Sequence, residues 1–335
     1  MRAVVVQRPG AAVLQRVPRP EPGRGEVLVR VGAAGICGSD VEVLEGRRPE
    51  RYVRYPIIPG HEWAGMVVAV GAGVENVNEG DAIVAEGFRA CGRCARCSEG
   101  RTNLCAAEYA ETGFTHAGAF ADFLCVPAHL VHRLPRETDL AAAAVLEPAA
   151  CVAQGLLEVD LRPGLTAAVV GSGTLGLLAV ALVSRISPAR LALVGTRAPR
   201  LALGAAMGAT ETWNVREEEH PEPGFDLVFE AAGTPAGVRT AVELARRGGT
   251  VVLEGISGQQ GGIDADAVVL GHLRVQGVFG ASRAAWRWVT QLFTDGLLET
   301  KPLVTHSFPL EQYDAAFTTL ADRSSDALKV QLTPR

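Results

Sequence analysis

Four cysteines lie within fifteen residues of this 335-residue chain. They are Cys91, Cys94, Cys97 and Cys105, with the spacing C-x2-C-x2-C-x7-C. The total of seven cysteines is odd, which does not fit a disulfide framework. Four thiolates on one short loop complete the tetrahedral shell of a zinc ion and leave no position open for substrate. The spacing therefore predicts a structural zinc site.

A glycine-rich turn is the second chemical signal. Residues 171–176 read G-S-G-T-L-G, between an apolar segment that predicts a strand (166–171) and one that predicts a helix (174–186). In this context G-x-G-x-x-G predicts a dinucleotide site, with the pyrophosphate at the helix N-terminus. Gly171 would make the tight turn, Gly173 would admit the pyrophosphate and Gly176 would let helix and sheet pack closely. Thr174 and Leu175 complete this predicted set, and a plain glycine-rich turn is the alternative in a chain with 38 glycines.

The next predicted strand, 189–195, bears on the choice of cofactor. NAD-binding proteins usually place a carboxylate at its end, where it binds the ribose hydroxyls. Here Thr196 stands at that place, and Arg197 and Arg200 follow. A 2′-phosphate is not repelled there and can pair with either arginine, so we expect NADP(H) to be preferred over NAD(H). Because only two of the 32 basic residues are lysine, arginines without a ligand are the alternative.

The order of apolar segments predicts two domains of an α/β protein. Segments 27–37, 66–74 and 81–86 indicate an irregular, barrel-like β domain. From 166 to 280, five predicted strands alternate with helices, as in a doubly wound parallel sheet. Two helical stretches and a strand (286–299, 310–322 and 327–332) are expected to return to the first domain. The predicted domains are residues 1–145 plus 282–335, and residues 146–281. Pro148 is expected to break or kink a helix near residue 140.

Composition argues against several classes of partner. The formal net charge is −5, which disfavours binding to nucleic acid or to an anionic membrane surface. It also disfavours reading the four-cysteine loop as a nucleic-acid-binding zinc module. No spanning helix and no signal peptide is expected, so we expect a cytoplasmic protein.

Further polar residues are scattered along the chain. They are Cys37 in CGSD, His61 and Glu62 in GHE, and Glu147 in LEP. Taken singly, Cys37 could be a buried thiol, His61 a core histidine, and each glutamate a solvated carboxylate.

Together with the other motifs, these residues carry a resemblance. The chain resembles the zinc-containing medium-chain dehydrogenase/reductase family, sorbitol and threonine dehydrogenase-like branch. The shared features are CGSD, GHEWAGMVVAVGAGV, the four-cysteine loop, LEPAACV and VVGSGTLG. They cover essentially the whole chain in the family's order. The resemblance implies a GroES-like irregular β-barrel catalytic domain and a Rossmann domain.

The resemblance also implies a catalytic zinc. Its ligands would be Cys37, His61 and the carboxylate of Glu147, with Glu62 beside them and water in the remaining place. Ser39 matches the hydroxyl that contacts the substrate alcohol and begins a proton relay. Relatives often carry histidine three residues later, where this chain has Glu42, so the outer part of that relay differs.

The expected function is hydride transfer between NADP(H) and a secondary alcohol or ketone of the polyol, sugar or cyclitol type. Two zinc ions per chain and a homodimer or homotetramer are expected. Residues near Trp63, Phe88, Phe114 and Trp286 are expected to line the substrate pocket. The alternatives are an NAD-dependent threonine- or sorbitol-type dehydrogenase and a non-catalytic NADPH-binding protein.

Overall fold

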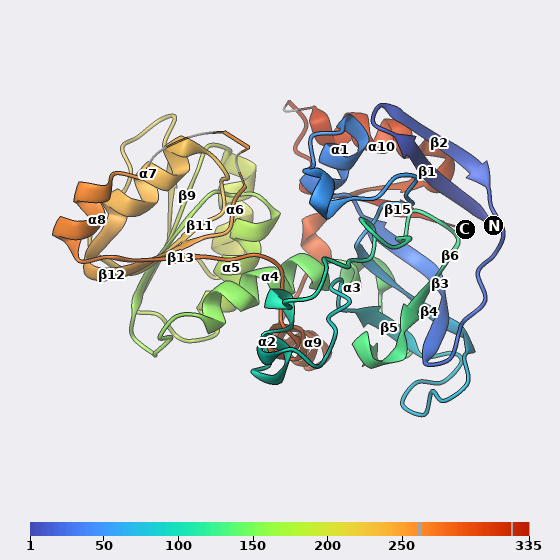
Figure 1. Cartoon of the computed structure of the whole chain (residues 1–335). Helices are drawn as coiled ribbons and strands as arrows, with labels where there is room; N and C mark the ends of the chain where they lie inside the picture. The colour runs from blue at the N-terminus through green and yellow to red at the C-terminus, as the bar shows by residue number, and fades with distance from the viewer. Residues whose placement is uncertain (257, 260, 262, 323, 335) are drawn as a thin grey trace. The chain divides into compact units, whose positions relative to one another are not determined.

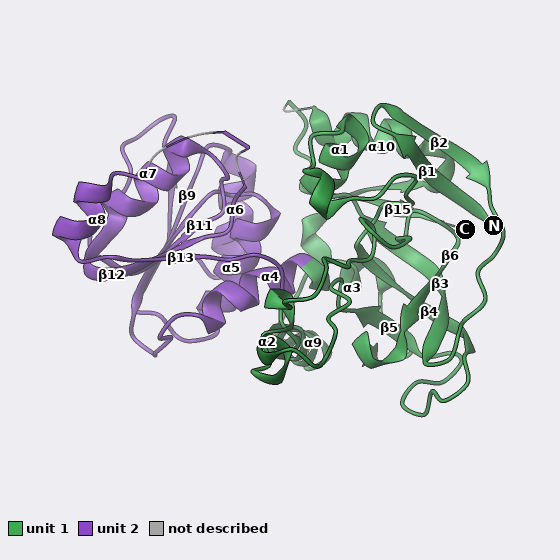
Figure 2. Ribbon diagram, in the orientation of Figure 1, with its two compact units in different colours: residues 1–147, 282–335 green, residues 148–281 purple. Residues whose placement is uncertain are grey.

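The structure is a computed structural model that describes residues 1–335 except 257, 260, 262, 323 and 335. The chain forms two compact units (Figure 1, Figure 2). Unit 1 comprises Met1–Glu147 and Ser282–Arg335, and unit 2 comprises Pro148–Ala281.

Unit 1 is built on a seven-stranded sheet. Its main path runs β14-β15-β3-β4-β5-β7, and β6 pairs with β3 outside that path. The strands are β3 (Glu26–Gly35), β4 (Glu62–Val70), β5 (Ala82–Ala85), β6 (Phe123–Pro127), β7 (Val131–Leu134), β14 (Val304–Pro309) and β15 (Lys329–Thr333). Valines at 27, 29 and 31 of β3 alternate inward and pack with β4 and β6 in one apolar core. A separate hairpin, β1 (Arg2–Arg8) with β2 (Ala11–Arg16), was not predicted from the sequence.

The C-terminal segment belongs to unit 1. Strand β15 pairs in parallel with β14 and antiparallel with β3, where Gln331 lies opposite Gly35. Gln331 is fully buried and donates to the carbonyl of Ala141 at 2.8 Å. The last strand therefore reaches the same end of β3 from which Cys37 follows.

The apolar stretch around residue 145 forms two helices, α3 (Leu140–Ala143) and α4 (Leu146–Leu157). The interruption falls at residues 144–145, and Pro148 lies in the first turn of α4. A proline is tolerated there because its missing N–H has no partner in the helix. In a continuous helix its ring would clash with the carbonyl of Ala144, four residues earlier, so the stretch is broken just before Pro148, as predicted. Leu140–Leu157 is long and apolar enough to cross a membrane, but 72% of it is buried inside the protein, as in a core helix.

Unit 2 contains a six-stranded parallel sheet in the order β10-β9-β8-β11-β12-β13. The strands are β8 (Thr166–Val170), β9 (Arg190–Gly195), β10 (Glu211–Asn214), β11 (Phe225–Glu230), β12 (Ala245–Leu253) and β13 (Arg274–Gly277). In sequence rank the order is 3-2-1-4-5-6, the Rossmann arrangement. The predicted doubly wound sheet is confirmed.

Four helices connect these strands: α5 (Thr174–Ser184), α6 (Ala198–Ala206), α7 (Pro235–Leu244) and α8 (Ala265–Gly271). Helix α5 is almost entirely buried, which explains its continuous apolar sequence. Helix α7 ends at Leu244, and residues 245–247 begin β12, where Ala245 pairs with Phe225. Sheet pairing therefore overrides the helical tendency of that segment.

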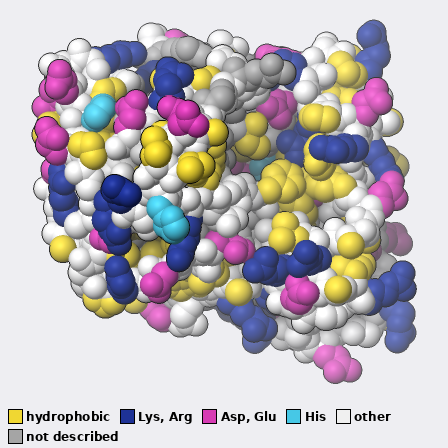
Figure 3. Space-filling model, turned by 60° about the vertical axis from the view of Figure 1, so that its left-hand side comes forward, with side chains coloured by type: hydrophobic (Ala, Val, Ile, Leu, Met, Phe, Trp, Pro, Cys, Tyr) yellow, Lys and Arg dark blue, Asp and Glu magenta, His cyan; other side chains and the backbone are white. Residues whose placement is uncertain are grey.

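The remaining helices belong to unit 1. They are α1 (Gly38–Glu45), α2 (Ala95–Ser98), α9 (Arg283–Thr294) and α10 (Tyr313–Ala321), with single 3-10 turns at Glu50–Tyr52, Thr102–Leu104, Ala128–Leu130, Lys301–Leu303 and Leu310–Gln312. On the face drawn in Figure 3, basic and acidic side chains are interspersed among the described residues. That face does not display the continuous basic surface typical of nucleic-acid binders.

Candidate metal and cofactor sites

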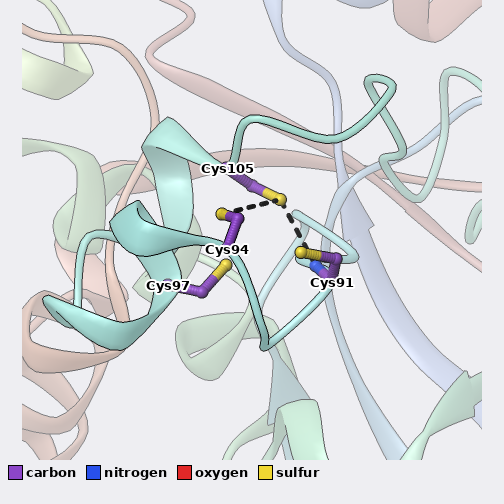
Figure 4. A group of neighbouring side chains, drawn as sticks. All are labelled: Cys91, Cys94, Cys97 and Cys105. Carbon is purple, nitrogen blue, oxygen red and sulfur yellow. Dashed lines mark hydrogen bonds between the residues drawn. The ribbon is translucent and has the colours of Figure 1, made fainter.

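The four-cysteine loop folds into one cluster. The sulfur atoms of Cys91, Cys94, Cys97 and Cys105 all lie within 4.8 Å of one another, and their side chains converge in Figure 4. Zn–S bonds of about 2.3 Å in a tetrahedron place sulfurs about 3.8 Å apart. The distance from Cys94 Sγ to Cys105 Sγ is 4.0 Å, so the donor set fits zinc.

Backbone groups stabilise thiolates in this cluster. The N–H of Cys91 donates to Cys105 Sγ at 3.3 Å, and the N–H of Ala106 donates to Cys94 Sγ at 3.4 Å. The hydrogen bond from Ala106, with one from Cys97, lowers the pKa of Cys94 to about 6. These donors favour the thiolate form of Cys94, the form that binds a metal, whereas burial raises the pKa of Cys97 to about 12.

The second group is assembled from two segments of unit 1. Cys37 follows β3 and caps α1, His61 directly precedes β4, and Glu62 is the first residue of β4. One ligand atom from each lies within 4.8 Å of the others. Thiolate, imidazole and carboxylate are the three kinds of ligand that zinc takes in catalytic sites.

Asp40 organises this group, although the sequence analysis did not single it out. Its fully buried carboxylate accepts from the N–H of Cys37 at 2.9 Å and from the N–H of Gly60 at 3.2 Å. The same carboxylate lies 3.4 Å from His61 Nδ1. Burial alone would lower the pKa of His61, but Asp40 raises it well above its ordinary value, with smaller contributions from Cys37 and Glu147. Because Nδ1 faces Asp40, Nε2 is the nitrogen available for a metal.

Glu147 and Ser39 occupy separate places. Glu147 is the second residue of α4. It is close enough to raise the pKa of His61 and of Lys329. Ser39 lies in the first turn of α1, half-buried, two residues after Cys37.

Lys329 is the most informative residue that the sequence analysis missed. It is the first residue of β15, is 5% exposed, and donates to Glu62 Oε1 at 2.8 Å and to Oε2 at 2.6 Å. Burial alone would lower the pKa of Lys329, but Glu62, followed by Cys37 and Glu147, raises it, so the amine stays charged. One feature of the sequence could have drawn attention to Lys329. It is one of only two lysines in the chain, and it lies in a predicted strand.

A third buried acid, Glu111, lies close enough to His61 to interact with its charge. It is 5% exposed, and burial raises its pKa to about 8. Its carboxylate accepts from the hydroxyl of Tyr109, and Arg48 lies 4.0 Å away. The ring of Phe114 is 4.7 Å from that of His61. No motif in the sequence indicated Glu111.

Of the aromatic residues expected near the substrate, Phe114 lies beside the candidate metal group. The ring of Phe88 packs edge-on against that of Tyr109 at 5.8 Å. Trp63 and Trp286 are each 2% exposed. Trp63 belongs to the core of the barrel, and Trp286 stacks on His132 at 5.6 Å. The side chains of the two tryptophans therefore serve packing.

Unit 2 contains a cavity of 890 Å³ at the carboxyl ends of its strands. Gly171 has φ of +112°, and a Cβ on it would lie 2.6 Å from the N of Ala232. A Cβ on Gly176 would lie 1.8 Å from the carbonyl oxygen of Gly171, so helix and turn approach closely there. At Gly173, which caps α5, a Cβ would meet nothing within 4 Å, so the backbone is open toward the cavity. This is the cradle that a pyrophosphate needs.

Among the described residues, Gly171, Gly173, Thr196, Arg197 and Arg200 line this cavity. Thr174, Leu175 and Gly176 form the first turn of α5 and are outside that lining. The lining residues that the sequence analysis missed include the titratable side chains of Glu218, Glu219 and His220. They follow β10, the strand beside β9, and their distance in sequence from the glycine turn hid them.

Comparison with known proteins agrees with this geometry. Residues 23–136 match the alcohol dehydrogenase GroES-like domain family, and residues 174–295 match the zinc-binding dehydrogenase family. The chain belongs to the zinc-containing medium-chain alcohol dehydrogenases. It is 33% identical to L-threonine 3-dehydrogenase of Bacillus velezensis, over 100% of this chain and 99% of that protein. It is 30% identical to sorbitol dehydrogenase of Bacillus subtilis, over 100% and 97%.

This medium-chain dehydrogenase also resembles solved dehydrogenase structures over its whole length. A zinc-binding dehydrogenase of Sinorhizobium meliloti bound to NADP superposes with a TM-score of 0.92, at 30% identity over 99% of both chains. Galactitol-1-phosphate dehydrogenase of Escherichia coli gives a TM-score of 0.89, at 27% identity over 100% of both. The chain is a zinc-dependent, NAD(P)-dependent dehydrogenase that acts on CH–OH groups, so the non-catalytic alternative falls away.

Proposed function

We propose that this dehydrogenase interconverts a secondary alcohol of the polyol, sugar or cyclitol class with its ketone and prefers NADP(H). The observation that carries the cofactor preference is the end of β9. Thr196 stands there without a carboxylate, and Arg197 and Arg200 line the same cavity. Guanidinium groups pair well with phosphate. The Sinorhizobium meliloti relative, bound to NADP, is in line with this choice.

The proposed metal content is two zinc ions per chain. Cys91, Cys94, Cys97 and Cys105 would hold the structural ion, and Cys37, His61 and a glutamate would hold the catalytic ion. Either Glu62 or Glu147 would supply the carboxylate. When bound, the catalytic zinc supplies Lewis acidity for the alcohol or ketone, and the nicotinamide supplies or accepts the hydride.

The protein's own residues then position these groups. Asp40 fixes the backbone of Cys37 and the ring of His61, so that one sulfur and one nitrogen face the same point. Ser39 would take the proton of the substrate hydroxyl and pass it outward. Glu42, at the place where relatives often have histidine, lies 3.7 Å from the guanidinium of Arg48 and 4.0 Å from that of Arg47.

The runner-up is an NAD-dependent dehydrogenase of the threonine or sorbitol type. It is favoured by the names of the curated relatives. The two acids Glu218 and Glu219 in the cavity also favour it, because a carboxylate opposes a 2′-phosphate. Initial rates with a panel of polyols, cyclitols, amino alcohols and ketones, each with NAD(H) and NADP(H), decide between the two. If kcat/KM is higher for L-threonine with NAD than for any polyol or cyclitol with NADP, our proposal is wrong and the enzyme is of the threonine dehydrogenase type.

Variants test the metal assignment on the best substrate of that panel. Cys37→Ser and His61→Ala should abolish turnover and leave NADPH affinity almost unchanged, because the described residues that line the nucleotide cavity belong to unit 2. Ser39→Ala should lower kcat at unchanged zinc content. Normal turnover in the Cys37 and His61 variants would refute the catalytic zinc site.

A further inference from the structure

A buried lysine engages one of the two candidate carboxylate ligands. Lys329 Nζ lies 2.8 Å from Oε1 and 2.6 Å from Oε2 of Glu62, and both residues are almost fully buried. The strand pairing leaves this pair little freedom. A Cβ at Gly35 would lie 2.3 Å from Glu62 Oε2 and 3.2 Å from Lys329 Cδ. The backbone of β3 thus forms one wall of the space in which the two side chains meet.

The charge of this lysine acts directly on the zinc-binding capacity of Glu62. A carboxylate has about four lone-pair directions, so Glu62 can accept from Lys329 and still reach a metal. Its negative charge is already balanced by the ammonium group at 2.6 Å. Lysine is a compact point charge with three donors, and here one ammonium serves both oxygens. Any zinc ion bound by Cys37 and His61 must therefore compete with Lys329 for the negative charge of Glu62, although lone pairs remain for both.

We propose that Lys329 is a positioning residue that restrains Glu62 from binding the catalytic zinc permanently. This inference rests on the proposed function, in which Cys37, His61 and a glutamate hold that ion. Restraint of Glu62 keeps one place in the zinc shell open for the substrate oxygen. Catalytic zinc sites need such an open place, whereas a permanent fourth protein ligand closes the shell.

Removal of the charge has a defined consequence. In Lys329→Met, zinc becomes the cation that balances Glu62, so zinc is held more tightly and the open place is lost. Groups in the outer shell change metal affinity by about 10- to 100-fold. We expect the release of catalytic zinc to a chelator to be slowed by that factor, while kcat falls. A lysine with a merely structural role would predict the opposite sign, faster release from a loosened site.

The test uses the zinc-loaded enzyme and its cobalt-substituted form. Release of Zn²⁺ to excess chelator is followed for wild type, Lys329→Met and Lys329→Arg, and the visible spectrum of Co²⁺ at the catalytic site reports the number of ligands. Lys329→Met should release zinc more slowly and shift the cobalt bands toward higher coordination. Lys329→Arg keeps the charge and should restore wild-type behaviour. Lys329→Gln, which lacks the charge but keeps a donor, provides the same test if the methionine variant does not fold.

Two outcomes overturn the inference. One is zinc release in the charge-removing variant that is unchanged or faster, with an unchanged cobalt spectrum. The other is an equal spectral shift when Lys329→Met is combined with Glu62→Gln, because Lys329 would then act without Glu62. Failure of the proposed function is recognised separately, since wild type would then bind zinc at the four-cysteine cluster alone.

Discussion

Gly35 and Glu62 lie opposite each other on β3 and β4, and a Cβ on Gly35 would come within 2.3 Å of Glu62 Oε2. Glycine at this position therefore determines where the carboxylate of Glu62 can lie. The constraint comes from the strand register, which places Ala34 opposite Trp63 and Gly35 opposite Glu62. A shift of one residue in the pairing of β3 with β4 would turn the side chain of Glu62 to the other face of the sheet. Glu62 would then no longer lie beside Cys37 and His61.

Gly35→Ala should consequently disturb the catalytic site more than the fold. The added methyl group must displace the carboxylate of Glu62, so we expect lower kcat and altered retention of the catalytic zinc. Zinc content and initial rates on one preparation provide the measurement. Gly277→Ala is the control, because a Cβ there meets nothing within 4 Å. Equal activity in both variants would show that the position of Glu62 is unimportant.

Cys105→Ser should remove the structural zinc. The cluster contributes folding energy through its metal, so the free energy of unfolding should fall by more than about 3 kcal/mol. Denaturant unfolding and elemental analysis measure the two effects together. Cys125→Ser is the matched control, because Cys125 is a half-buried thiol of β6 outside the cluster, and burial raises its pKa to about 11. Loss of zinc in the Cys125 variant would contradict the assignment.

The sequence predicted those parts of the fold in which the signal is local. The strand, glycine turn and helix from 166 to 184 are consecutive, and each carries its own apolar pattern. The four cysteines span one loop, so their spacing alone places them together. Cys37 and His61 were recognised through the family's motifs, because single residues of these types are common in protein cores.

The contacts that the sequence did not reveal join distant segments. Lys329 and Glu62 are 267 residues apart, and they meet only because β15 pairs with β3. Asp40 and Gly60 are joined across 20 residues by a hydrogen bond that no motif describes. Glu218 and Glu219 reach the cofactor cavity because β10 lies beside β9 in the sheet. Such residues depend on strand order, which is set by the whole domain.

Asp226 should make the stability of the enzyme depend on acid pH. It accepts from the N–H and the hydroxyl of Thr166, both at 2.8 Å, and from Arg246 at 2.8 Å. Burial alone would raise its pKa, but these partners lower it to about 2. Because the folded-state pKa is lowered, the stabilisation is present above the unfolded-state value near 4 and is lost as the pH falls toward 2.

Asp226→Asn should therefore lower the free energy of unfolding at pH 7 by about 1 kcal/mol, a value reduced for the partial exposure of the group. The difference from wild type should shrink below pH 4. Denaturant unfolding at pH 7, 5 and 3 measures it, with the exposed Asp160→Asn as control. A difference that stays constant across this range would mean that the Asp226 charge contributes nothing.

Arg197→Ala should weaken the binding of NADPH more than that of NADH. Arg197 caps α6 and lines the cofactor cavity. A hydrogen bond to a charged group is worth about 1.5–3 kcal/mol, which corresponds to roughly 10- to 100-fold in affinity. Fluorescence titration with both reduced cofactors provides the measurement. Arg185→Ala, on the exposed end of α5 and outside the lining, should affect neither cofactor. Equal loss for both cofactors would remove Arg197 from the recognition of a 2′-phosphate.

Glu219 should act in the opposite sense from Arg197. It lines the same cavity, and its negative charge opposes a second negative charge brought by the 2′-phosphate. The side chain of Glu218 is less free to move when a cofactor binds, because its Oε1 accepts from the N–H of Asn214 at 2.9 Å.

Glu219→Gln keeps the shape of the side chain and removes its charge. We expect the ratio of NADPH to NADH affinity to rise by up to about fivefold, as an exposed charge pair is worth up to about 1 kcal/mol. Glu217→Gln, outside the cavity lining, is the control. A fall in that ratio would mean that Glu219 helps to hold the adenosine end of either cofactor, and the preference for NADP(H) would then rest on Thr196, Arg197 and Arg200 alone.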